Sequence, residues 1–215
     1  MAKVYPNVAV PSLALPAATA AAEAGDEEPV TLTVWRKSLL FNCRGFTVFD
    51  ASGNLVYRVD SYASDSRAEV VLMDAAGRAV LTVRRKKKAI GLVGGDQWLV
   101  FPGEDTCAAP LYAVKRRGGG GNKSVAHVAA CGGAVGGGRY EVEGLYARRC
   151  CVVYDEQRRA VAEVRPKEAM VGTDVFRMVV RPAAGGMDVS LAMAVVLALD
   201  EMFGKPSLLR NWSFS

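Results

Sequence analysis

One pattern of apolar and polar positions occurs three times along this chain. In each copy an apolar run leads into an Asp, a short turn follows, and a second run alternates between apolar and mixed positions. The copies span residues 46–60, 70–84 and 151–165. Counted from the Asp, the fifth, seventh and ninth positions are apolar in every copy. Such period-two alternation buries one face of a strand and leaves the other in water, which is typical of an antiparallel sheet.

The turn in each copy begins with Asp. An Asp carboxylate accepts hydrogen bonds from the backbone N–H groups just ahead of it, and Gly closes such turns because it tolerates positive φ. The turns are Asp50-Ala51-Ser52-Gly53, Asp74-Ala75-Ala76-Gly77 and Asp155-Glu156-Gln157-Arg158. Because Arg158 stands where the other copies have Gly, the third turn is predicted to be strained or built differently.

The rest of the chain before residue 185 adds six strand candidates and shows no competing helical period. These candidates lie near residues 31–36, 96–101, 110–116, 124–131, 139–145 and 173–181. Each hairpin copy contributes two strands, so the chain is predicted to form twelve. Turn signals such as Pro102-Gly103 fall between them.

The apolar segment near the C-terminus has a different character, because it is rich in Ala, Leu and Met and does not alternate. It predicts a helix of about sixteen residues over 188–203, started by Asp188 or Ser190 and ended at Gly204. The apolar residues of this helix lie on all of its faces, so every face must be buried. Its length of roughly 24 Å falls short of the ~30 Å hydrocarbon layer, which disfavours a membrane span.

The strands and the helix fit one architecture. A barrel of about eight strands is filled by its own side chains, so twelve strands leave a lumen that needs a plug. A helix ~10 Å across fits that role, and the small inward residues Ala79, Ala160 and Ala162 leave it room. The sequence therefore predicts a mainly β protein, a twelve-stranded antiparallel barrel enclosing one apolar C-terminal helix.

The domain boundaries follow from composition. An Ala/Pro-rich leader over 1–29 is interrupted by prolines and has neither a signal-peptide pattern nor the Arg-rich character of a transit peptide. We expect it to be flexible, although the Val4-Tyr5-Pro6 region could pack on the domain. The barrel domain is predicted over 30–206, with a tail over 207–215.

The spacing of the five cysteines does not match a disulfide framework or a zinc site. No C-x-x-C pair occurs and Cys150 is directly followed by Cys151, whereas disulfide scaffolds and zinc sites need wider spacing. We expect buried thiols in a reducing, cytoplasmic compartment. No metal or other cofactor is predicted.

The basic charge is concentrated in one run. The formal net charge is +5, and a single segment carries five cations, namely Arg84, Arg85, Lys86, Lys87 and Lys88. Clustered cations gain about 1 kcal/mol each near an anionic leaflet, so these five residues are the candidate lipid-binding site. The same run could be a nuclear-import signal or a solvated strand end that discourages edge pairing.

Catalytic residues are not indicated. The one histidine, His127, lies in an alternating run without a nucleophile and acid in triad order. The Asp residues at the hairpins are explained as turn formers. Gly91-Leu92-Val93-Gly94-Gly95 lacks the Lys-Ser/Thr of a phosphate-binding loop. We expect a binding domain rather than an enzyme.

Several blocks of the sequence resemble the plant LURP-one-related proteins over about residues 30–205. The blocks are Leu32–Phe41, Gly45–Asp50, Gly53–Asp60, Leu81–Lys87, Trp98–Phe101 and Val161–Arg165. The resemblance implies the tubby C-terminal-like fold, a twelve-stranded barrel around a central helix that tubby proteins and phospholipid scramblases share. The Gly-rich insert 118–138 departs from the family pattern.

The resemblance also implies two classes of function. Relatives in the superfamily bind phosphoinositides at membranes, and some are proposed to regulate transcription in the nucleus; the plant family is linked to pathogen defence. The chain is therefore expected to be a phosphoinositide- or membrane-tethered regulator, peripheral at the plasma membrane, or a protein-interaction scaffold or transcriptional regulator in the nucleus. A basic, aromatic-lined pocket would favour the first class, and an exposed apolar patch away from residues 84–88 the second.

Overall fold

The computed structural model describes residues 28–37, 44–61, 69–86, 96–117, 123–132, 138–167, 173–181 and 187–204. Some predictions fall outside these ranges. They concern the leader up to residue 27, including the Val4–Pro6 region, parts of the insert 118–138, and the tail 207–215.

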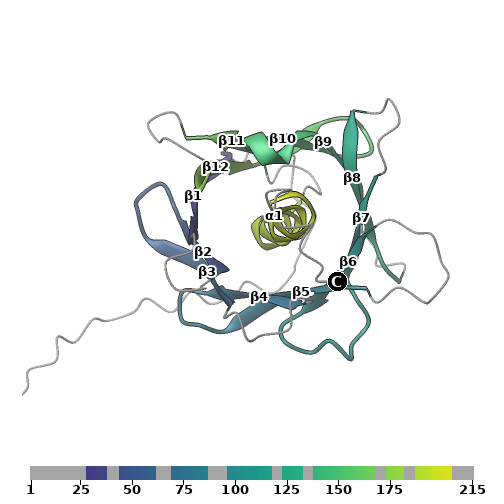
Figure 1. The fold of residues 1–215 in the computed structure, drawn as a ribbon, viewed down its shortest axis with the longest axis horizontal. Helices are drawn as coiled ribbons and strands as arrows, with labels where there is room; N and C mark the ends of the chain where they lie inside the picture. The colour runs from purple at the N-terminus through teal and green to yellow at the C-terminus, as the bar shows by residue number, and fades with distance from the viewer. Residues whose placement is uncertain are drawn as a thin grey trace, which may run out of the picture.

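Twelve strands form a closed barrel in which every strand pairs antiparallel with its neighbours in sequence, and β1 closes the ring on β12 (Figure 1). The first six are β1 (Val30–Lys37), β2 (Arg44–Phe49), β3 (Leu55–Ser61), β4 (Glu69–Asp74), β5 (Ala79–Arg85) and β6 (Gln97–Pro102). The others are β7 (Tyr112–Arg116), β8 (Ser124–Ala130), β9 (Arg139–Leu145), β10 (Cys150–Tyr154), β11 (Ala160–Pro166) and β12 (Val175–Val180). The predicted number of strands and their antiparallel order are confirmed.

The helix α1 (Val189–Phe203) runs through the barrel (Figure 1). Every residue from Leu191 to Asp200 is buried, because the inward-facing side chains of the strands surround it. Asp188 caps its start by accepting from the N–H groups of Ser190 and Leu191 at 2.7 and 3.1 Å. The predicted helix is confirmed, and its burial on every side holds over Leu191–Asp200, whereas Val189, Ser190, Glu201 and Phe203 near its ends are half-buried. None of the described residues forms a helix long and apolar enough to cross a membrane.

The three Asp turns share one construction. With the Asp counted as the first residue of the turn, the N–H of the fourth residue donates to the Asp carbonyl oxygen at 3.0–3.1 Å. The N–H of the fifth residue donates to the Asp carboxylate at 2.8–2.9 Å. The fourth residue has positive φ in all three: 84° at Gly53, 85° at Gly77 and 62° at Arg158. Arg158 therefore adopts a left-handed conformation that costs a non-glycine residue energy. The prediction that the third turn is either strained or built differently is therefore met by its first alternative: the hydrogen bonds are the same, and the strain lies at Arg158.

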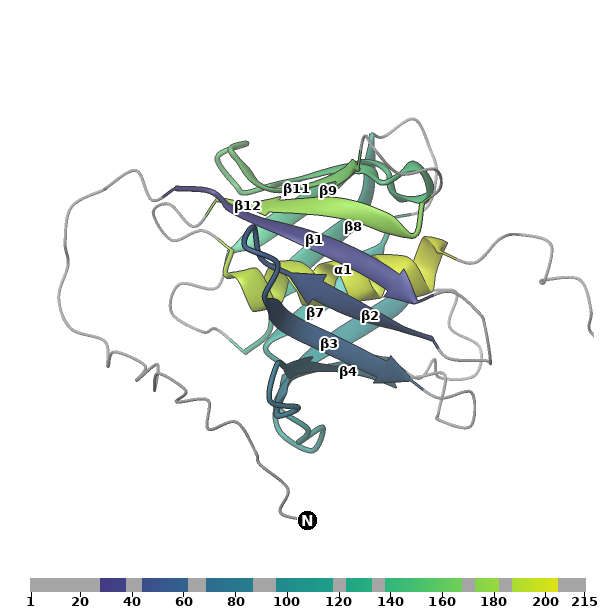
Figure 2. The same cartoon turned by 90° about the vertical axis from the view of Figure 1, so that its left-hand side faces the viewer.

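Different strand ends and turns form the two ends of the barrel. The odd-numbered strands end where α1 ends, as Figure 2 shows, since neighbouring strands alternate in direction. We call this end the carboxyl rim; its strand-end residues are Lys37, Ser61, Arg85, Arg116, Leu145 and Pro166. The Arg116 guanidinium lies 4.8 Å from the ring centre of Phe203, in the last turn of α1. The opposite end, the amino rim, carries the three Asp turns.

Candidate functional site

Arg84, the first cation of the basic run, is held against the outer wall by the segment that follows β6. Its Nη1 donates to the Thr106 hydroxyl at 2.7 Å and its Nη2 to the Thr106 carbonyl oxygen at 3.0 Å. The guanidinium also lies over the Phe101 ring, 5.1 Å from its centre. Beneath the same segment, the buried Thr82 hydroxyl donates to the Gly103 carbonyl oxygen at 2.6 Å. Arg84 therefore fixes this segment on the outer face of β5.

The next two cations of the run differ in their contacts. Arg85 Nη2 lies 2.6 Å from Asp96 Oδ1. The side chain of Lys86 is exposed and has no ion-pair partner among the residues that the structure describes. Lys87 and Lys88 lie outside the described residues. The structure thus brings three predicted site residues together at the end of β5. Two of them, Arg84 and Arg85, form contacts within the protein, and Lys86 does not form an ion pair with any described residue.

Further exposed cations gather at the carboxyl rim. They are Lys86, Lys123, Arg148 and the ion-paired Arg117 and Arg165. The amino rim carries more acidic than basic residues. Its acids are Glu28, Asp50, Asp74, Glu104, Asp105, Asp155, Glu156 and Asp188, against the cations Arg78, Arg139, Arg158, Arg159 and Arg181. The side chain and backbone N–H of Asn54 lower the pKa of Asp50 below its ordinary value, so this turn carboxylate stays charged. The described barrel is therefore polarised along its axis, with the positive end at the carboxyl rim.

A buried ion cluster closes the barrel just inside that rim. Asp200 of α1 is 7% exposed and Arg149 is 3% exposed. Both terminal nitrogens of Arg149 lie 3.3 Å from Asp200 Oδ1, and Arg36 Nε lies 3.2 Å from Oδ2. The Tyr146 hydroxyl donates to Oδ1 at 3.3 Å. The last turn of a helix is an unfavourable place for a carboxylate, because the helix dipole is negative there. The two guanidinium groups offset that charge.

Each nitrogen of the Arg149 guanidinium already has a partner within the protein. Its guanidinium lies 4.4 Å from the ring centres of Tyr146 and Phe176, and its Nε donates to the Thr173 carbonyl oxygen at 2.8 Å. Burial, followed by the nearby Asp200 charge, raises the pKa of Tyr146 well above its ordinary value, so its hydroxyl remains a donor. The cluster therefore locks α1 to the 3₁₀ turn η1 (Tyr146–Arg148) and to β1.

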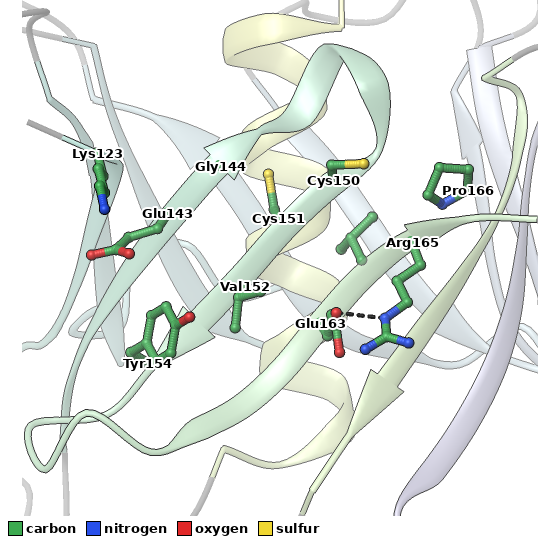
Figure 3. A pocket seen from close by; sticks show the side chains of 11 residues that line it. Lys123, Glu143, Gly144, Cys150, Cys151, Val152, Tyr154, Glu163, Arg165 and Pro166 are labelled. Atoms are coloured by element: carbon green, nitrogen blue, oxygen red, sulfur yellow. Dashed lines mark hydrogen bonds and ion pairs between the residues drawn. The ribbon is translucent and has the colours of Figure 1, made fainter.

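A shallow groove of about 890 Å³ lies on the outer wall over β9, β10 and β11 (Figure 3). Its floor holds the half-buried side chains of Val152 and Tyr154. Its edges are ion-paired: Glu143 accepts from Arg158 at 2.8 Å, and Glu163 pairs with Arg165. In the ring of strands β11 is opposite β5, and β9 is four strands from it. The groove is thus an apolar surface away from the basic run, with mixed charge at its edges.

The thiols are less buried than predicted. Cys151 is buried inside the barrel, but Cys107 and Cys150 are exposed and Cys131 is half-buried. The expectation of buried thiols is therefore wrong for two of the cysteines described; Cys43 lies outside the described residues. The cause is strand alternation, which turns Cys150 outward into the groove and Cys151 inward. The described residues include no cluster of His, Cys, Asp and Glu that could hold a metal ion.

Cys150 and Cys151 are expected to differ in their reaction with iodoacetamide. Burial, followed by the neighbouring Cys150, raises the pKa of Cys151 to about 12, and only the thiolate is an effective nucleophile. At pH 8 the folded protein should be alkylated at Cys150 and not at Cys151, whereas unfolding in urea should open both to alkylation. Fragment-ion mass spectrometry of the peptide that contains both residues distinguishes them. Equal labelling of both in the folded protein would contradict this placement.

The ion cluster and the groove were not predicted from the sequence. One signal for the cluster was present, because Asp200 and Glu201 are charged residues in a mostly apolar helix, and a buried carboxylate requires a cationic or hydrogen-bonding partner. The partner Arg149 is 51 residues away in sequence, so no local pattern identifies it. The groove is formed by outward-facing residues of three strands. These positions hold both polar and apolar residues, so no regular pattern in the sequence marks them.

Comparison with known proteins gives consistent matches. The sequence profile of the family described as LURP-one-related matches residues 30–200. LURP-one-related 8 of Arabidopsis thaliana is 41% identical over 183 residues, which cover 81% of this chain and 87% of the relative. LURP-one-related 5 of the same plant is 41% identical over 187 residues, covering 82% and 85%. An X-ray structure of an Arabidopsis thaliana protein aligns with a TM-score of 0.57 and 24% identity, covering 81% of this chain and 91% of that one. The structural match supports the fold.

Proposed function

This chain belongs to the LURP-one-related family, and we propose that it is a non-enzymatic domain that binds anionic phospholipid surfaces, phosphoinositides among them, through its carboxyl rim. The observation that carries this proposal is the charge polarity of the barrel. Lys86, Lys123 and Arg148 are exposed at one end, and each cation near an anionic leaflet contributes about 1 kcal/mol. In this proposal the protein is a regulator of plant defence signalling, peripheral at the cytoplasmic face of the plasma membrane.

The contacts of the basic run refine the proposed site. Arg84 and Arg85 hold neighbouring segments in place through Thr106 and Asp96, so we assign them a structural part at the site. Lys86 and the two lysines after it then supply the membrane contact. An exposed cation stays hydrated and mobile, and it can move toward phosphate oxygens without breaking an existing ion pair.

The one histidine of the chain lies in the barrel wall. His127 lies on β8 and is paired in register with Lys115 and Glu141 on the neighbouring strands. Within the described part of the chain, no hydrogen bond joins it to a Ser, Thr or Cys. A general base needs such a contact with its nucleophile. The position of His127 thus supports a non-catalytic part in the outer wall.

The triple variant K86Q/K87Q/K88Q is expected to bind more weakly to vesicles of phosphatidylcholine, phosphatidylserine and phosphatidylinositol 4,5-bisphosphate. Three contacts of about 1 kcal/mol each correspond to a loss of up to about 100-fold in affinity. Raising salt should weaken binding of the unsubstituted protein in the same direction, because exposed charges are screened within about 8–10 Å. Liposome co-sedimentation measures both effects.

A matched control removes three cations from the amino rim instead. R78Q/R139Q/R159Q has the same net charge as K86Q/K87Q/K88Q, and its effect on binding should be a fewfold at most. Both variants should keep the melting temperature, since exposed charges contribute little to stability. Equal losses in the two variants would contradict the rim assignment. Salt-insensitive binding, or no binding by the unsubstituted protein, would reject the lipid function.

The groove favours a second candidate function, a protein-interaction scaffold or nuclear transcriptional regulator. Its apolar floor at Val152 and Tyr154 lies on a wall away from the basic run, and apolar surface of this kind is typical of protein contact sites. This candidate takes precedence if the vesicle measurements fail.

A further inference from the structure

Three large hydrophobic side chains are exposed among the residues described. They are Trp35 at 53%, Leu111 at 39% and Leu145 at 50%. Trp35 and Leu145 lie at the carboxyl rim, on β1 and at the end of β9, whereas Leu111 precedes β7 at the amino rim. Two of the three therefore share the end of the barrel on which the exposed cations gather.

The fold holds Trp35 outward by strand alternation. Its neighbours in sequence, Val34 and Arg36, face the interior, where Val34 is fully buried and Arg36 pairs with Asp200. Because successive residues of a strand point to opposite faces, Trp35 must point away from the barrel. Its ring is therefore fixed on the outside near the rim.

Leu145 is held outward by the buried ion cluster. It precedes η1, in which Tyr146 is buried while Ala147 and Arg148 are exposed. Tyr146 and Arg149 both contact Asp200, so the turn is anchored at its first residue and directly after its last. Leu145 and Arg148 consequently project from a fixed turn, an apolar side chain and a cation within one short segment.

These residues are spread evenly around the rim. Trp35 lies on β1, Lys86 directly follows β5, and Leu145 ends β9. In the closed ring of twelve strands these elements are four strands apart. Their positions therefore surround the barrel axis, so a surface laid across the carboxyl rim faces all three sides of the barrel.

We propose that the carboxyl rim rests flat on an anionic bilayer, with Trp35 and Leu145 inserted at the level of the headgroups and with α1 aligned along the membrane normal. This inference rests on the proposed lipid function and adds the orientation and the inserting side chains. Trp is favoured at the membrane interface because its ring is apolar and its N–H is polar. Arg148, which follows Leu145 in the same turn, and Lys86, at a separate point of the rim, meet the lipid phosphates.

Variants at the exposed hydrophobic positions test the insertion. Trp35→Ala and Leu145→Ala should each weaken binding to the same phosphatidylinositol 4,5-bisphosphate vesicles by about tenfold, because each withdraws apolar surface from the lipid. The loss should persist at high salt, unlike that of K86Q/K87Q/K88Q. Leu111→Ala makes the same kind of truncation at the amino rim and should change affinity less than twofold. Equal effects of Leu111→Ala and Leu145→Ala would overturn the proposed orientation.

Tryptophan quenching by brominated lipid gives a readout that does not depend on truncation. In a Trp212→Phe background the remaining tryptophans are Trp35 and the core residue Trp98, so vesicle binding should quench the Trp35 signal. Quenching should disappear when Trp35 is changed to Phe. Salt-sensitive binding without quenching would overturn the insertion and leave the lipid function standing. Absence of binding would overturn both.

Discussion

Ala194→Asp is expected to prevent the chain from folding into a soluble barrel. Ala194 is fully buried at the middle of α1, with barrel wall on every side. Arg149 is the one buried cation among the described residues, and Asp200 already pairs with it. An unpaired buried charge costs several kcal/mol before overpacking is added. Net stabilities of domains are only about 5–15 kcal/mol. The soluble yield and the melting temperature measured by circular dichroism should both fall sharply.

Two comparisons separate the causes of that loss. Ala51→Asp makes the same substitution at an exposed position of the first Asp turn and should leave yield and melting temperature close to those of the unsubstituted protein. Ala194→Asn adds nearly the same volume without charge, so it should be destabilised less than Ala194→Asp. A soluble Ala194→Asp variant with an unchanged melting temperature would show that the helix does not need an apolar lumen.

The elements of the fold could be predicted from the sequence because their signals are local. The apolar positions after Asp50, Asp74 and Asp155 alternate over single hairpins, and all three hairpins occur in the structure. The absence of alternation in 188–203 likewise indicated a helix buried on all sides. Closure of the barrel followed from a volume argument, since twelve strands enclose more space than their own side chains fill. The family resemblance implied the same number of strands.

The contacts between distant segments could not be predicted in the same way. Arg84 belongs to the basic run predicted to contact lipid, yet its guanidinium donates to Thr106, which lies 22 residues later in the sequence. The charge polarity of the two rims was also hidden in the sequence. It arises because antiparallel order brings Lys86, Lys123 and Arg148 to one end, although the sequence shows only one basic run.

Asp200→Asn is expected to lower the free energy of unfolding by about 3–5 kcal/mol, the usual cost of leaving a buried charge without its partner. The substitution leaves Arg149, which is 3% exposed, with no carboxylate. Arg36 loses its closest anionic contact and keeps Asp174 at 3.7 Å. For a domain of this size the loss corresponds to a fall of the order of 10 °C in melting temperature. Urea unfolding followed by tryptophan fluorescence measures the free energy directly.

The matched control is Asp188→Asn, at the other end of the same helix. Asp188 caps the helix from an exposed position, and Asn is as good an N-cap as Asp, so the cost should stay within a few tenths of a kcal/mol. Arg149→Met should be destabilising alone, but less so in combination with Asp200→Asn, because the double variant leaves no unpaired charge of this pair. Strict additivity of the two changes, or equal effects of Asp188→Asn and Asp200→Asn, would show that Asp200 does not lock α1 to η1 and β1. A loss that is unchanged between low and high salt would agree with a buried pair, since screening acts mainly on exposed charges.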